Sequence, residues 1–333
     1  MAPGMLVEGE WKTESRREDE EGRFIRPSSA FRHFVTADGS SGYKAEPGRY
    51  HLYISWACPW AHRTAIMRKL KGLEWAVSMS VLDPVMGEES WVFSDRPGCI
   101  PDPVNGAERL HEIYTKADPG YTGRVSTPVF WDKKESTIVN NESREIMRML
   151  DTEFKAFAKE DANFYPEDMG EEIDRTLDEL YEPVNNGVYR TGFATKQTAY
   201  DEAVTELFGA LDHWEEVLAR RRYLCGDRIT EADWAFFTTL VRFDPVYHGH
   251  FKCNLRRIVD YPNLWGYLKD LYQQPGVAET VDLDHIKRHY YVTHKSINPT
   301  GIVPKGPILY YDSPHNRSVC LHKGRGRGLG GYT

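Results

Sequence analysis

The sequence predicts an α/β domain followed by an all-helical domain, and two patterns support this fold class. Between residues 50 and 155, short apolar runs typical of strands alternate with runs at helical spacing. After residue 170 the strand patterns fade, and apolar residues recur every three or four positions. A chain of 333 residues also exceeds the roughly 100–200 residues of a usual domain. We therefore expect two domains.

The α/β domain is expected to begin with a strand, a helix and a second strand. Apolar residues alternate at 52–55 and at 77–81, while the run from 60 to 73 has helical spacing. This order implies a right-handed crossover in a parallel sheet. Farther on, the apolar runs 129–131 and 138–139 flank a polar turn, as in a β-hairpin.

Two helices are expected to complete this domain. The segment 83–123 is rich in Pro, Gly and Asp, is long for a loop and should hold an irregular helix. A final helix begins near Glu142 and Ser143 and runs through Leu150.

The second domain is predicted from helical stripes. The longest stripe comprises Tyr200, Ala203, Val204, Leu207, Phe208, Leu211, Trp214 and Leu218. Thr230 and Asp233 precede the apolar run 234–237 and resemble a capping box with Asp in place of Glu. Another helix at 264–271 is stopped by Pro275 and Gly276.

The domain boundaries follow from these patterns. We place an N-terminal extension at 1–40, the α/β domain at 41–160, the helical domain at 170–307 and a tail at 308–333. The charged residues 8–24 and the Arg-Gly segment 323–333 are expected to be frayed or disordered.

Composition and charge exclude several classes of partner. The chain is 40% hydrophobic and 28% charged, as in ordinary globular proteins. Its net charge of −8 provides no basic field for nucleic acid. No apolar stretch approaches the roughly 20 residues that span a bilayer, and residues 1–22 lack the apolar segment of a signal peptide. We expect a cytoplasmic protein without nucleic-acid or membrane partners.

The five cysteines are scattered and odd in number, so free thiols are expected. They are Cys58, Cys99, Cys225, Cys253 and Cys320. Only Cys58 has a suggestive context, because it lies between a strand and a helix that begins with Pro59. The amides and dipole of a helix N-terminus favour the thiolate. A small buried hydrophobic residue is the alternative.

Cys58 has no local disulfide partner, because Ala61 stands where a dithiol oxidoreductase carries its second cysteine. Its oxidised partner must come from outside the chain, and glutathione is the obvious candidate through a mixed disulfide. His62 could face Cys58 on the helix, point to solvent or cap a carbonyl. The segment 248–253 lacks a fourth zinc ligand and is interpreted as a polar turn, so no metal is expected.

Two more motifs can contribute to a site at Cys58. Thr127-Pro128 precedes a strand, and a cis peptide would turn the backbone of Thr127 toward the thiol, although the isomer stays open. Glu142-Ser143 begins a helix, where a carboxylate can be held, or serves only as a cap.

These motifs occur together in one known family. The order Cys58-Pro59-Trp60-Ala61, Thr127-Pro128, Glu142-Ser143 and Thr230-x-x-Asp233 resembles the glutathione transferase superfamily, and more narrowly its xi class, the glutathionyl-hydroquinone reductases. The resemblance covers roughly residues 40–307. Its specific marks are Ser55 to Arg63, Arg124-Val125, Asn185 to Tyr189, His289-Tyr290-Tyr291 and Asn298-Pro299.

The resemblance implies a thioredoxin-like domain that binds glutathione and a helical domain for the second substrate. The implied glutathione contacts are Trp91, Arg124, Val125, Thr127, Pro128, Glu142 and Ser143. Tyr189 and Tyr290, with Tyr291, match tyrosines at the quinol hydroxyls. Thr127 replaces the valine of the family, which should be tolerated because the backbone makes that contact.

The implied activity is glutathione-dependent removal of glutathione from glutathionyl-hydroquinones through a Cys58–glutathione mixed disulfide. Glutathione is the only co-substrate, no metal is needed, and a homodimer is expected by analogy. Two alternatives remain. One is a general thioltransferase or dehydroascorbate reductase, and the other is a non-catalytic scaffold.

Overall fold

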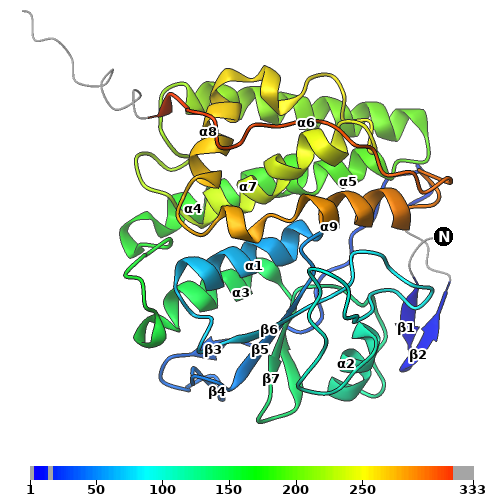
Figure 1. Cartoon of the computed structure of the whole chain (residues 1–333), viewed down its shortest axis with the longest axis vertical. Helices are drawn as coiled ribbons and strands as arrows, with labels where there is room; N and C mark the ends of the chain where they lie inside the picture. The colour runs from blue at the N-terminus through cyan, green and yellow to red at the C-terminus, as the bar shows by residue number, and fades with distance from the viewer. Residues whose placement is uncertain (1–3, 14–17, 318–333) are drawn as a thin grey trace, which may run out of the picture.

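The computed structural model describes residues 4–13 and 18–317, which form two packed domains (Figure 1). The first domain is built on a four-stranded sheet in the order β6–β5–β7–β8. Its strands are β5 (Tyr50–Ile54), β6 (Ser78–Val81), β7 (Val129–Asp132) and β8 (Thr137–Asn140). β5 and β6 are parallel, whereas β7 is antiparallel to both of its neighbours. The predicted strands and hairpin are therefore present.

Helices cover both faces of this sheet. α1 (Pro59–Leu70) and α3 (Ser143–Thr152) lie between the sheet and the helical domain, and α2 (Leu110–Ala117) covers the opposite face (Figure 1). This is the expected thioredoxin-like arrangement. All five residues of β5 are buried, because Leu52 packs into the core on one face and Tyr53 into the core on the other. The alternation in its sequence does not separate a buried from an exposed face.

Residues 8–24 are predicted to be frayed, but the described part of this range contains a strand at Glu10–Lys12 and the buried Phe24, while many of its other residues are exposed. β1 (Met5–Val7) pairs with β2 (Glu10–Lys12), and β3 (Val35–Thr36) pairs with β4 (Tyr43–Lys44). Leu6 is fully buried and exchanges two backbone hydrogen bonds with Gly123. A few apolar residues among the charges provide these anchors. Residues 323–333 and Cys320 lie outside the described residues.

The second domain is entirely helical. Its helices are α4 (Gly170–Leu180), α5 (Gly187–Gly192), α6 (Gln197–Leu218), α7 (Glu231–Arg242), α8 (Pro262–Tyr272) and α9 (Leu283–Arg288). π-helical turns at Tyr181–Asn185, Phe243–Tyr247 and His289–Thr293 follow α4, α7 and α9. Short 3₁₀ helices occupy Lys155–Phe157, Glu167–Met169, Ile258–Asp260 and Ala278–Thr280. Within the described ranges, no helix is long and apolar enough to cross a membrane.

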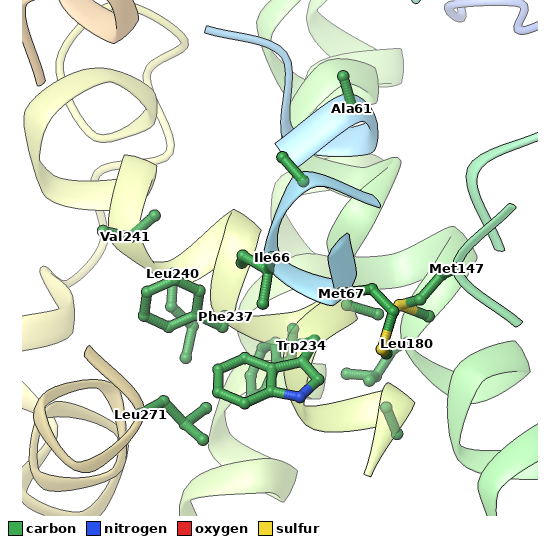
Figure 2. Packing of buried hydrophobic residues seen from close by; sticks show 14 of the residues in the cluster. Ala61, Ile66, Met67, Met147, Leu180, Trp234, Phe237, Leu240, Val241 and Leu271 are labelled. Atoms are coloured by element: carbon green, nitrogen blue, oxygen red, sulfur yellow. The ribbon is translucent and has the colours of Figure 1, made fainter. Parts of the chain in front are cut away.

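Helix α7 is the centre of a core that both domains share. All of its residues are buried. Figure 2 shows its side chains packed with those of neighbouring helices, among them Trp234 and Phe237 of α7, Ile66 of α1, Met147 of α3 and Leu271 of α8. A continuous apolar contact of this kind holds the two domains in one relative position.

The predicted capping box begins α7. The carboxylate of Asp233 accepts hydrogen bonds from the backbone N–H of Thr230 at 2.7 Å and from its hydroxyl at 2.9 Å. The same carboxylate accepts from the N–H of Leu224 at 3.0 Å and from the hydroxyl of Tyr267 at 2.8 Å. Asp233 is fully buried.

We expect Asp233→Ala to destabilise the protein strongly, because it leaves these donors buried without an acceptor. Each such group costs about 1–3 kcal/mol, so the free energy of unfolding should fall by about 3 kcal/mol or more. Denaturant titration measures this loss. The exposed Asp227→Ala serves as a control and should stay within about 0.5 kcal/mol of the unchanged protein. Equal stability of the two variants would contradict the prediction.

Candidate active site

Cys58 lies at the start of α1, as the sequence predicts. It is the extended N-cap residue, and Pro59 is the first residue of the helix. The side chain is 9% exposed, and its Sγ donates a hydrogen bond to the carbonyl oxygen of Thr127 at 3.3 Å. The Thr127–Pro128 peptide is cis. The fold therefore brings two motifs together that are about 70 residues apart in the chain.

The net shift of the Cys58 pKa is opposite to the one expected from its position at a helix start. Burial raises the pKa of the thiol above its ordinary value, because it removes water from the thiolate. The amides of Ala61 and Trp60 and the guanidinium groups of Arg242 and Arg26 lower that pKa, as the helix argument predicts, but they do not outweigh burial.

A groove of about 870 Å³ opens next to the start of α1. Cys58 is not among its lining residues, but the Cys58 Sγ bonds to Thr127, which is. The walls of the groove come from residues 26–34 of the N-terminal segment, from the loop at 121–128 and from the first turns of α3. Five of the expected glutathione contacts line it, namely Arg124, Thr127, Pro128, Glu142 and Ser143. Trp91 and Val125 lie outside this lining and are buried; the Trp91 ring stacks on His289 with centroids 4.8 Å apart.

One end of the groove combines a carboxylate with unpartnered donors. Glu142 caps α3 by accepting from the N–H of Arg144 at 3.3 Å, and it also accepts from the hydroxyl of Ser29 at 2.9 Å. Among the described residues, the buried Oγ of Ser143 and Nε of Arg63 have no hydrogen-bond partner. Burial lowers the pKa of Arg63 to about 10, so it remains a cation at neutral pH. This arrangement suits a ligand that carries both a carboxylate and an ammonium group.

Three buried tyrosines form a hydroxyl cluster above the thiol. Tyr189 of α5 lies 2.6 Å from Tyr290, oxygen to oxygen, and Tyr247 lies 3.0 Å from Tyr290. Burial raises the pKa of all three hydroxyls, so they stay protonated at neutral pH. Negative charge on Cys58 raises the pKa of Tyr189 further, which ties the cluster to the thiol.

Sequence reasoning missed Tyr247, which comes from a π-helical turn without any distinctive spacing. Tyr291, by contrast, lies apart from the cluster. Its hydroxyl donates to the carbonyl of Pro245 at 3.3 Å.

Arg26 was also missed, because it lies in the N-terminal extension and in none of the motifs that the sequence predicts for the site. Its guanidinium lies 4.9 Å from the ring centre of Trp60 and 4.8 Å from that of Tyr189. Its Nε donates to Asn186 at 2.8 Å. Within the described part of the chain no carboxylate pairs with it, so an uncompensated cation stands between the groove and the tyrosines.

His62 does not face Cys58, and it neither points to solvent nor caps a carbonyl. It is fully buried. Its Nε2 lies 2.8 Å from the hydroxyl of Thr280, and its Nδ1 accepts from Arg242 at 3.0 Å. The tight packing between α1 and α7 turns the ring into the domain interface.

The segment 248–253 contains the predicted turn, at residues 248–251, but it is less polar than predicted. Phe251 and Cys253 are fully buried, and the ring of Phe251 packs on Tyr290. His250 lies 3.3 Å from His294, nitrogen to nitrogen. Among residues 4–13 and 18–317, no three His, Cys, Asp or Glu side chains gather as a metal site requires. Cys58, Cys99, Cys225 and Cys253 are free thiols.

Comparison with known proteins identifies the family. Residues 57–153 match the family model of the glutathione S-transferase N-terminal domain, and residues 197–270 match that of the C-terminal domain. The chain is 52% identical to glutathionyl-hydroquinone reductase YqjG of Escherichia coli, over 95% of this chain and 99% of that protein. It is also 52% identical to glutathionyl-hydroquinone reductase PcpF of Sphingobium chlorophenolicum, over 91% of this chain and 96% of that protein.

Solved structures agree. The xi class transferase of Natrialba magadii is 55% identical and superposes with a TM-score of 0.91, covering 95% of this chain and 97% of that one. Glutathione-bound YqjG of Escherichia coli is 50% identical with a TM-score of 0.88, covering 95% and 99%. The two-domain fold and the sequence thus agree with those of known proteins over nearly the whole chain, and this chain belongs to the xi class of the glutathione S-transferase family.

Proposed function

We propose that this protein is a glutathionyl-hydroquinone reductase, which removes glutathione from a hydroquinone ring. The observation that carries the proposal is the set of contacts of Cys58: its Sγ bonds to Thr127 in the wall of a groove large enough for a tripeptide, and its charge acts on Tyr189 of the cluster of protonated tyrosines. Both reductases with which the chain shares 52% identity support the same activity.

The groove would hold the glutathionyl part of the substrate. The carboxylate of Glu142 faces the α-ammonium group, while Ser143, the amides that open α3 and the cation of Arg63 face the α-carboxylate. Arg124 supplies a further cation along the groove. The backbone of Thr127 next to the thiol aligns the peptide part. The thioether sulfur is thereby presented to Cys58.

The first step is attack of the Cys58 thiolate on that sulfur. A sulfur–sulfur bond forms and the carbon–sulfur bond breaks, so the electron pair leaves with the ring carbon. The ring reacts as its keto tautomer, in which the carbon that bears sulfur already carries a proton. The electron pair of the broken bond passes to the keto oxygen, which accepts a hydrogen bond from Tyr189 or Tyr290 and takes up the proton released when the Cys58 thiol ionised. The products are free hydroquinone and a Cys58–glutathione mixed disulfide.

The second step restores the enzyme. The thiolate of another glutathione attacks the mixed disulfide, forms oxidised glutathione and releases the Cys58 thiolate. In sum, one glutathionyl-hydroquinone and one glutathione give hydroquinone and oxidised glutathione. Glutathione is thus co-substrate and reductant, and this proposal uses no metal.

We propose a cytoplasmic homodimer with the domain boundaries expected above. Helical transferase domains usually pair, and three large apolar side chains on the segment after α9 are exposed, namely Ile302, Ile308 and Tyr310.

Intact-mass spectrometry tests the nucleophile. With a glutathionyl-hydroquinone and no free glutathione, the protein should gain one glutathionyl group on Cys58 and release hydroquinone. Because burial raises the thiol pKa and only the thiolate attacks, the rate of this gain should increase as the pH rises from 7 to 9. Cys58→Ala should abolish thioether cleavage, whereas Cys99→Ser should not. Unchanged cleavage by Cys58→Ala would show that another site carries the reaction.

The tyrosine cluster distinguishes the proposed activity from that of a general thioltransferase. Tyr290→Phe removes a hydroxyl that bonds both Tyr189 and Tyr247. We expect kcat for a glutathionyl-hydroquinone to fall by about 10²-fold, the lower range for loss of an acid–base group. Reduction of a simple glutathione mixed disulfide needs no ring protonation and should be retained. If both activities fall equally, the cluster has no specific role toward quinols.

Arg26 should contribute charge at the junction between groove and cluster. We expect Arg26→Met to lower kcat/KM for the hydroquinone substrate by about 10- to 100-fold, the effect of losing a charge-assisted contact of about 1.5–3 kcal/mol. Arg32→Met is the matched control, because Arg32 lies on the same segment and lines the same groove but is paired with Glu145. Similar losses in the two variants would contradict a specific role for Arg26.

A further inference from the structure

Arg242, the last residue of α7, is a fully buried cation without a carboxylate partner. Its side chain is 0% exposed, and among the described residues no carboxylate oxygen lies within ion-pair distance. Its guanidinium instead donates to the carbonyl of Thr238 in its own helix at 2.7 Å. Burial of a charge without a counter-ion is costly. We therefore expect either that an anion can form near Arg242 or that a function explains why this costly burial is kept.

The other donors of Arg242 cross the domain interface to the loop that carries Cys58. Its Nη2 donates to the carbonyl of Trp56 at 2.7 Å, and its Nε donates to the carbonyl of Ala57 at 3.0 Å. These are the two peptide groups immediately before the nucleophile. Because buried carbonyls need donors, the direction of the Cys58 side chain depends on this guanidinium.

His62 supplies no negative charge to Arg242. Its Nδ1 accepts from the guanidinium, so its Nε2 carries the proton and donates to Thr280, whose hydroxyl donates to Val277. Burial and the charge of Arg242 hold the pKa of His62 well below its ordinary value, and the ring stays neutral.

The remaining ionisable groups on which the charge of Arg242 acts are Cys58, Tyr247, Tyr290 and Tyr311. Burial keeps the three tyrosines protonated. Cys58 also faces the cations of Arg26 and Arg63 and the hydroxyl of Tyr189. A thiol ionises more readily than a phenol, so Cys58 is the group that can become the counter-ion.

We propose that Arg242 is the positioning residue of the nucleophile: from the helical domain it holds the two carbonyls before Cys58 and supplies the buried positive charge that the Cys58 thiolate balances. The inference rests on the proposed role of Cys58 in catalysis. It adds that the helical domain, besides forming the second substrate pocket, controls the ionisation of a thiol in the other domain.

The test measures thiol ionisation directly, without glutathione or hydroquinone. Iodoacetamide labelling of Cys58 is followed between pH 6 and 11 by mass spectrometry of its peptide. We expect Arg242→Gln to slow labelling at pH 8 at least tenfold and to move the profile about one pH unit or more upward, since one pKa unit is a factor of ten. Arg242→Lys keeps the positive charge but lacks the planar set of guanidinium donors. The Cys58 labelling profile of this variant should therefore lie between those of Arg242→Gln and the unchanged protein.

Arg317→Gln is the matched control. Arg317 is also fully buried and donates to the carbonyls of Leu218, Arg221 and Arg222, but it is not among the charges that act on Cys58. It should lower the melting temperature and leave the Cys58 profile unchanged. The Cys99 peptide reports general accessibility in every variant.

A folded Arg242→Gln with an unchanged Cys58 profile would overturn the proposal, and so would an equal shift in Arg317→Gln. If Arg242→Gln does not fold, the test rests on Arg242→Lys. An unchanged Cys58 labelling profile in Arg242→Lys would then overturn the proposal. A failed reductase assay with a clear Arg242 effect would reject only the hydroquinone substrate. The two hypotheses therefore fail separately.

Discussion

The complete burial of α7 between the two domains is the constraint on which the site depends. Its apolar face packs against helices of both domains, and Asp233 stabilises its start by accepting from four buried donors. A helix held in this way cannot shift without loss of close packing. Arg242 and Tyr247 at its far end are therefore placed accurately against a thiol that belongs to the other domain.

The environment of Cys58 balances two opposing effects. Burial raises the cost of the thiolate, and helix amides with nearby guanidinium groups lower it. Arg26 and Arg242 act on the same sulfur from the N-terminal segment and from the helical domain, respectively, and carboxylates neutralise neither within the described residues. A buried thiol with uncompensated cations around it can be protected from general oxidation and still be ionised when a substrate needs it.

The three π-helical turns show how the helical domain adapts to this site. They end α4, α7 and α9, and they carry Asn185, Tyr247 and Tyr290. Wider turns of this kind are rare and often occur at functional sites, because they redirect a side chain that a regular helix would send elsewhere. The Tyr247–Tyr290 contact joins two such turns across 43 residues of sequence.

Local sequence patterns were sufficient for the strands of the main sheet and for the position of Cys58 at a helix start, but not for the strands of the N-terminal segment. The main-sheet strands, the hairpin, the capping box at Thr230 and the helix start at Cys58 all follow from periodicity and cap chemistry, which act over a few residues. The tertiary structure alone decided which distant charges meet. It placed Arg26 and Arg242 beside the thiol, turned His62 into the interface and reversed the expected shift of the Cys58 pKa. The physical reason is that burial and Coulomb interactions depend on three-dimensional distance and on excluded water, neither of which is written in the spacing of residues along a chain.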